Sequence, residues 1–136
     1  MTVPLTCLLA FAAWTLALVV FPIGAIRIPK VLLGRAKAND FPADEPHGSP
    51  AYGRVLRAHL NCVENLPVFG AVVVVAHLAG VGSPIFDRLA LVYIAARVLQ
   101  SIVHISSGSA LAVTTRFHFF LAQIVCVVWM GALLVV

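Results

Sequence analysis

Hydrophobic residues fall in four long stretches along the chain, separated by segments that carry most of the glycine, proline and charged residues. A helix needs about 20 apolar residues to cross the hydrocarbon core of a bilayer, and each stretch reaches that length. We therefore predict an all-α membrane protein whose four spanning helices form one domain over residues 1–136. The predicted spans cover about residues 4–26, 57–78, 85–105 and 112–135.

Two of the three connections are short, which predicts that consecutive helices are antiparallel neighbours in a bundle. Glycine and proline at residues 80–84 interrupt the second connection, and serine and glycine at residues 106–109 interrupt the third. The first connection, about residues 27–56, is much longer. Its middle part, residues 39–53, is rich in proline, glycine and aspartate, so we expect an irregular segment, either a lid over a site or a plain solvated linker.

The composition also indicates an integral membrane protein. Of the 136 residues, 62% are hydrophobic and only 10% are charged, whereas soluble domains use about 25% charged residues. The three cysteines are widely spaced and indicate neither a metal site nor a disulfide framework. The net charge of +4 comes from basic residues near helix ends, so it does not indicate a nucleic-acid partner.

The basic residues predict an orientation in the membrane. Five of the nine lysines and arginines lie in the first connection, namely Arg27, Lys30, Arg35, Lys37 and Arg54. By the positive-inside tendency, we expect this connection and the third one to face the cytoplasm and both chain ends to face away. The sequence leaves open whether the membrane is a bacterial inner membrane or the endoplasmic reticulum.

Polar side chains recur at helical spacing inside the predicted spans. Residues four and seven positions apart lie on one face of a helix. One such row begins the second span, another ends the third, and the fourth span opens with an arginine. Because these three helix ends lie at the same end of the bundle, we expect one polar layer there. Its members are Arg57, Asn61, Glu64, Arg97, Gln100, His104 and Arg116.

This polar layer holds three arginines and one carboxylate. A charge inside a membrane segment costs roughly 2.5–3.5 kcal/mol on insertion scales, so such charges usually face the bundle interior and mark functional sites. The excess of positive charge indicates an anionic ligand. The alternative is a structural network in which Glu64 pairs with Arg57 or Arg97 and Asn61 links two helices.

Glutathione fits the chemistry of such a site. Its carboxylates suit arginine, its ammonium group suits Glu64, and its peptide groups suit Asn61. Its reactions need the thiolate, which forms at neutral pH when a cation lies nearby. An arginine fixed at the mouth of a helix supplies that cation.

Two runs of the sequence resemble a known family. R-A-H-L-N-C-V-E-N-L-P-V-F, residues 57–69, is similar to the second-helix signature of the MAPEG family, the membrane-associated proteins in eicosanoid and glutathione metabolism. A-R-V-L-Q-S-I-V-H, residues 96–104, is similar to the third-helix pattern of that family. The resemblance implies a left-handed four-helix bundle that assembles as a homotrimer, with glutathione bound between adjacent subunits at the cytoplasmic side.

The resemblance also implies roles for individual residues. Arg116 looks like the arginine that stabilises the thiolate, and it is the expected catalytic residue. His104 stands where relatives usually have a tyrosine, and Gln100 where they have a tyrosine or histidine. The expected glutathione-binding residues are Arg35, Arg57, His59, Asn61, Glu64, Arg97, Gln100 and His104.

The leading functional hypothesis is a glutathione-dependent transferase or peroxidase with a role in detoxification. The thiolate attacks a hydrophobic electrophile or a lipid hydroperoxide that enters from the bilayer. A second hypothesis is a non-catalytic protein on the same fold that binds lipid-like ligands or acts as a scaffold, which the two tyrosine replacements favour. A third is a bis-histidine haem or proton-conducting bundle that uses His59, His77, His104 or His118.

Overall fold

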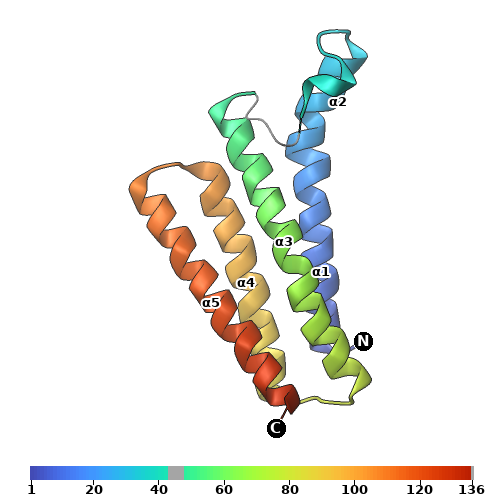
Figure 1. Ribbon diagram of the computed structural model, residues 1–136, viewed down its shortest axis with the longest axis vertical. Coiled ribbons are helices and arrows are strands. Elements are labelled where there is room, and N and C mark those ends of the chain that lie inside the picture. The colour runs from blue at the N-terminus through green and yellow to red at the C-terminus, as the bar shows by residue number, and fades with distance from the viewer. Residues whose placement is uncertain (43–47, 136) are drawn as a thin grey trace.

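The computed structural model describes residues 1–42 and 48–135. All regular structure within these residues is helical, and four segments are long and apolar enough to cross a membrane, as predicted (Figure 1). The elements are α1 (Val3–Leu18), the π-helical turn η1 (Val19–Ile23), α2 (Gly24–Leu32), the short 3-10 helix η2 (Ala38–Asp40), α3 (Pro50–Leu78), α4 (Pro84–Ser106) and α5 (Ala110–Val135).

The arrangement of the helices brings three predicted polar segments to one end of the molecule. The connection from α2 to α3 and the connection from α4 to α5 lie at this end, whereas both termini and the link from α3 to α4 lie at the other (Figure 1). The α4 helix packs against α5, α1 and α3. The start of α3, the end of α4 and the start of α5 are therefore neighbours.

The first spanning segment is longer than its predicted span. Helix continues from α1 through η1 and α2, for 30 residues in all, and this corresponds to about 45 Å at about 1.5 Å per residue. Pro22 lies inside the π turn, whose wider backbone accommodates a residue that donates no hydrogen bond. The hydrocarbon core is only about 30 Å thick, so the helix is longer than a span requires. The part that carries Arg27 and Lys30 can extend beyond the hydrocarbon core.

The α3 helix begins at Pro50, seven residues before the predicted start at Arg57. The Ser49 hydroxyl oxygen accepts a hydrogen bond from the Tyr52 backbone nitrogen at 3.2 Å, and a proline suits the first helical position. Residues 50–53 are therefore helical, and the prediction of an irregular segment there is wrong. The part of the lid hypothesis that falls on residues 43–47 lies outside the described residues.

An arginine joins the start of α3 to the end of the first spanning segment. The Arg27 Nε atom donates a hydrogen bond to the Tyr52 hydroxyl. Its guanidinium also lies over two aromatic rings, 5.1 Å from the centre of Phe41 and 5.7 Å from the centre of Tyr52. Such cation–π contacts contribute about 0.5–1 kcal/mol at exposed sites and more when desolvated.

Three aromatic side chains form the centre of the core. Phe11 of α1, Phe69 of α3 and Tyr93 of α4 are 0%, 0% and 2% exposed. The rings of Phe69 and Tyr93 stack with their centres 4.2 Å apart, and Phe11 is tilted against both. Because each ring comes from a different helix, this cluster fixes how α1, α3 and α4 pack.

A glycine ends α3. Gly80 has a φ of +67°, its nitrogen bonds the His77 carbonyl oxygen at 3.2 Å, and the Val81 nitrogen bonds the Ala76 carbonyl oxygen at 2.9 Å. These two bonds form a Schellman motif, in which glycine is favoured because it has no β-carbon.

We expect Gly80→Ala to lower the free energy of unfolding by about 1 kcal/mol, because alanine is strained at this backbone angle. A β-carbon at Gly80 meets no atom within 4 Å, so the cost is conformational and not steric. Denaturation in detergent micelles measures the change. Gly82→Ala is the matched control, since Gly82 also has open space but no positive φ; an equal loss in both variants would contradict the prediction.

Candidate functional site

A cavity of about 370 Å³ lies between α3, α4 and α5 at the end of the bundle where their polar segments meet. Its volume falls within the range of about 300–1,000 Å³ that small-molecule sites occupy. Five of the nine residues predicted for the site line it. The complete lining comprises Arg57, Asn61, Gln100, His104, Val113, Arg116, Phe117 and Phe120.

The helical repeat explains why these residues meet. Asn61 follows Arg57 by four positions on α3, and His104 follows Gln100 by four positions on α4, so each pair lies on one helix face. Arg116 sits two turns into α5 and completes the third wall. No carboxylate is present among the described residues that line the cavity. Its electrostatic character is therefore that of an anion site.

The α5 wall adds apolar side chains to this basic cavity. Phe117 is 56% exposed and Phe120 is half-buried, and both line the cavity next to Arg116. Neither was predicted as a site residue, because phenylalanine in an apolar span gives no distinguishing signal. The cavity thus places a guanidinium beside an apolar surface.

Gln100 links two walls of the cavity. Its side chain is 6% exposed, and its Nε2 atom donates a hydrogen bond to the main-chain oxygen of Arg116 at 3.2 Å. The bond joins α4 to α5 at the level of the predicted catalytic arginine. Gln100 therefore helps to fix the backbone from which the Arg116 side chain extends.

Arg97 lies behind the cavity and does not line it. Its side chain is 1% exposed, and its Nη1 atom donates to Asn61 Oδ1 and, at 3.0 Å, to Gln100 Oε1. Its guanidinium carbon lies 5.5 Å from the centre of the Phe11 ring. Arg97 thus contacts two cavity residues and the aromatic cluster, and Asn61 links α3 to α4 as the structural alternative expected.

The two other predicted residues of α3 face away from the cavity. The His59 Nδ1 atom donates to the Thr15 carbonyl oxygen at 3.1 Å, so this ring packs towards α1. The Glu64 side chain is exposed and does not contribute to the cavity lining. The alternative in which Arg97 pairs with Glu64 is not observed, because the hydrogen bonds of Arg97 go to the side-chain and main-chain oxygens of Asn61 and to Gln100 Oε1.

Arg35 lines a different cavity. This cavity, of about 390 Å³, lies against α2 and the start of α3, and Lys30, Asp40 and Tyr52 line it as well. Within one chain, Arg35 therefore does not share a cavity with Arg57 or Arg116.

Sequence reasoning missed Gln123, a polar residue in the middle of an apolar helix. It is 1% exposed, and its Nε2 atom donates to Gln100 Oε1 at 3.1 Å and to the Phe119 carbonyl oxygen at 2.9 Å. It lies seven residues after Arg116 and thus on the same face of α5. An isolated glutamine within a spanning helix is itself a signal, since polar groups there seek partners on other helices.

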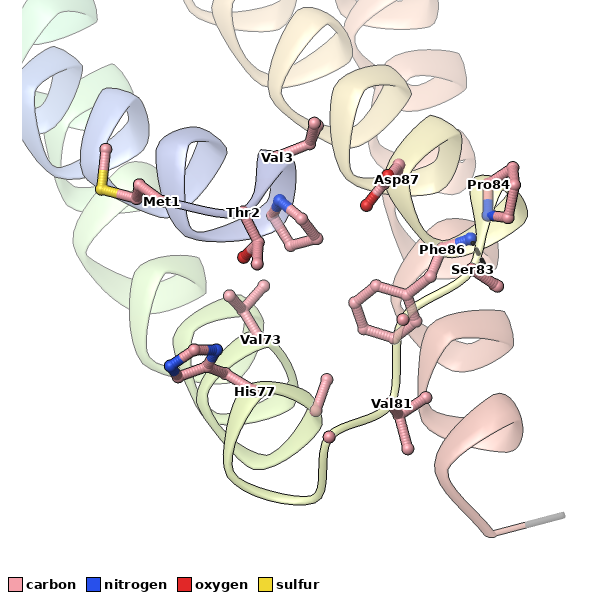
Figure 2. Close-up of a pocket in the computed structure, with 14 residues that line it drawn as sticks. Met1, Thr2, Val3, Val73, His77, Val81, Ser83, Pro84, Phe86 and Asp87 are labelled. Carbon is pink, nitrogen blue, oxygen red and sulfur yellow. Dashed lines mark hydrogen bonds between the residues drawn. The ribbon is translucent and has the colours of Figure 1, made fainter.

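Another cavity, of about 710 Å³, lies at the opposite end of the bundle. Figure 2 shows Val73 and His77 of α3 on one side of it, with Phe86 and Asp87 of α4 on another. Asp87 lies in the first turn of α4, where a carboxylate is favourable for the helix dipole. The two cavities share no residue, so this one is separate from the candidate site.

Comparison with known proteins gives one result. The family model described as the MAPEG family matches residues 4–136, which is essentially the whole chain. No curated protein matches the chain.

Proposed function

Because this chain belongs to the MAPEG family of multi-pass membrane proteins, we propose that it is a glutathione-dependent transferase or peroxidase acting on hydrophobic electrophiles. The observation that supports the proposal is the cavity in which Arg57, Asn61 and Arg116 meet without a carboxylate among the described lining residues. The family is associated with the use of glutathione, whose two carboxylates and thiolate match a cavity with excess positive charge.

The residues around the cavity suggest a division of roles. Arg57 and Asn61 bind a carboxylate and a peptide group of glutathione, and the Arg116 guanidinium lies next to the sulfur. A cation beside the thiol favours loss of its proton, and the thiolate is the nucleophile. Phe117 and Phe120 provide an apolar surface for an electrophile that arrives from the bilayer.

Two reactions are compatible with this arrangement. In a transfer, the thiolate forms a carbon–sulfur bond, and the leaving group departs with the electron pair of the bond that breaks. In a peroxidase reaction, the thiolate attacks the terminal hydroperoxide oxygen and the oxygen–oxygen bond breaks. The alkoxide that leaves takes a proton and becomes the lipid alcohol. The glutathione sulfenic acid then reacts with a second glutathione to give the disulfide and water.

We also propose a homotrimer in which a second copy covers Glu64. Glu64 lies seven residues, or about 10 Å, deeper along α3 than Arg57, and its side chain is exposed in the single chain. A carboxylate that faced lipid at this depth would be unfavourable by a few kcal/mol. In an assembly, Glu64 can bind the ammonium group of glutathione, and Arg35 and His59 can extend the site from the adjacent subunit.

The same end of the bundle is the proposed cytoplasmic end. The described basic residues of the first connection and the arginines of the cavity lie at this end (Figure 1). By the positive-inside tendency, we expect this end to face the cytoplasm.

The proposal predicts that the purified protein binds glutathione and converts it to the thiolate at neutral pH. Titration with glutathione, followed by thiolate ultraviolet absorbance and by calorimetry, measures both. In Arg57→Ala we expect the affinity for glutathione to fall about 10-fold or more, because a charge-assisted hydrogen bond contributes roughly 1.5–3 kcal/mol.

The wild-type result separates the remaining hypotheses. Glutathione binding without a thiolate signal or turnover would favour the non-catalytic scaffold on the same fold. If the wild-type protein neither binds glutathione nor gives a thiolate signal, the transferase proposal is refuted. Equal affinity in wild type and Arg57→Ala would remove Arg57 from the binding site.

A further inference from the structure

A buried polar network lies directly behind the candidate cavity. Arg97 and Gln123 are each 1% exposed and Gln100 is 6% exposed, although all three lie within apolar spanning helices. Neither Arg97 nor Gln123 lines the cavity. Buried polar groups in a membrane bundle are costly unless they form hydrogen bonds, so their bonds indicate what they do.

Arg97 determines the orientation of two side-chain amides. Its Nη1 atom donates to Asn61 Oδ1 and to Gln100 Oε1, the latter at 3.0 Å. A guanidinium has only donors, so an amide beside it must turn its oxygen inwards. The amide nitrogens of Asn61 and Gln100 consequently point away from Arg97.

Gln123 fixes the Gln100 amide from a second direction. Its Nε2 atom donates to Gln100 Oε1 at 3.1 Å and to the Phe119 carbonyl oxygen at 2.9 Å. The Phe119 carbonyl oxygen can only accept a hydrogen bond. If the Gln123 amide turned over, its Oε1 atom would face this oxygen, and two acceptors would lie together. With two donors on its oxygen, Gln100 directs its Nε2 atom to the Arg116 main-chain oxygen at 3.2 Å.

The consequence reaches the cavity through the residues that line it. Asn61 and Gln100 belong to its wall together with Arg57 and Arg116. When the oxygens of both amides bond the buried network, they do not offer acceptors to the cavity, and the guanidinium groups of Arg57 and Arg116 determine the charge of the wall. A wall that offers cations and no acceptors binds an anionic ligand more tightly than an analogue of the same ligand with masked carboxylates.

We propose that Arg97 and Gln123 are positioning residues that make the cavity selective for anions, by holding the amides of Asn61 and Gln100 with their oxygens turned inwards. They act through these amides and do not touch the ligand. The identity of the anion as glutathione rests on the proposed function, whereas the selectivity for anions does not.

The test exchanges the polarity of Gln123 without changing its size. Gln123→Glu replaces one of the two donors to Gln100 Oε1 with an acceptor, so only Arg97 still holds the Gln100 oxygen, and the bond from Gln100 Nε2 to the Arg116 oxygen is weakened. Wild-type and variant proteins are titrated with glutathione and with its diethyl ester, in which both carboxylates are masked. We expect the preference for the free acid to fall about 10-fold in Gln123→Glu, in line with a mispaired buried hydrogen bond, with little change for the ester.

Two further variants distinguish positioning from packing. Gln123→Leu removes the donor and keeps the volume, and we expect a smaller loss of preference, about threefold, because Arg97 still holds Gln100. Met130→Ala is the matched control, since Met130 lies on the same face of α5 and is 0% exposed. It should lower thermal stability and leave the preference for the free acid unchanged.

The outcomes separate this inference from the proposed function. Because the carboxylate of Gln123→Glu also repels anions by its charge, the neutral Gln123→Leu decides the question. An unchanged preference in Gln123→Leu, or an equal loss in Met130→Ala, would overturn the inference while leaving the transferase proposal intact. If wild type binds no glutathione, inorganic sulfate is the second probe, and its effect on the melting temperature is measured. Stabilisation by sulfate that is reduced in Gln123→Leu would then support the inference, and equal or no stabilisation in both proteins would overturn it.

Discussion

Arg116→Ala should lower kcat for the glutathione reaction by about 100-fold or more, while the affinity for glutathione changes by less than about threefold. Removal of one group that stabilises charge at a reacting centre typically costs 100- to 1,000-fold in kcat. Arg116 is half-buried beside the apolar Phe117 and Phe120, where a cation is poorly screened by water. Arg57 and Asn61 remain in place to bind the rest of glutathione.

Steady-state kinetics and the thiolate absorbance of the bound co-substrate measure the two parts of this expectation. The control is Arg88→Ala, because Arg88 is exposed and lies at the opposite end of the bundle. It removes one positive charge without altering the cavity. If Arg116→Ala kept its kcat and lost affinity instead, Arg116 would be a binding residue, and the cation that stabilises the thiolate would have to be sought elsewhere.

Phe69→Ala should cause the largest loss of stability, about 3–5 kcal/mol in the free energy of unfolding. Phe69 is 0% exposed, and it stacks on Tyr93 and contacts Phe11, so one substitution opens a void between three helices. Lipid gives little hydrophobic driving force between helices, and tight packing is therefore a main source of their association. Reversible denaturation in micelles measures the loss.

Phe21→Ala is the matched control for this prediction. It makes the same chemical change at a side chain that is 71% exposed, and we expect it to cost less than about 1 kcal/mol. Equal losses in the two variants would mean that the aromatic cluster contributes no special stability. The lost free energy would then reflect phenylalanine content and not its position.

The number and order of the spanning helices could be predicted from the sequence, but their ends could not. Apolar length identifies a span because the bilayer sets a minimum, but it does not set a maximum. The sequence-based boundaries therefore fall at the charged residues Arg27 and Arg57. The helices pass both, because Pro22 is accommodated in a π turn and Ser49 caps a helix that begins at Pro50.

The candidate site was predicted in part, and the reason is geometric. Helical spacing identifies which residues share a face, and it brought Arg57 and Asn61 to the cavity together with Gln100 and His104. Spacing does not say which neighbour the face meets or how deep a residue lies. Arg97 is therefore buried behind the wall of the cavity, although its spacing predicted that it would line the site. Gln123 is uncharged and stands alone in an apolar helix, so a pattern based on charge does not identify it.

The buried Arg97 has a consequence for how the chain enters the membrane. A lone α4 would carry this permanent charge into lipid, at a cost of roughly 2.5–3.5 kcal/mol on the scale of the translocon. The partner that meets Arg97 on the preceding helix is Asn61, and the link from α3 to α4 comprises only residues 79–83. Within the described residues of α4 itself, the Arg97 side chain bonds only Gln100, so a helical hairpin of α3 and α4 is the smallest unit in which Arg97 has both of its amide partners. We therefore expect α3 and α4 to enter the membrane as a pair.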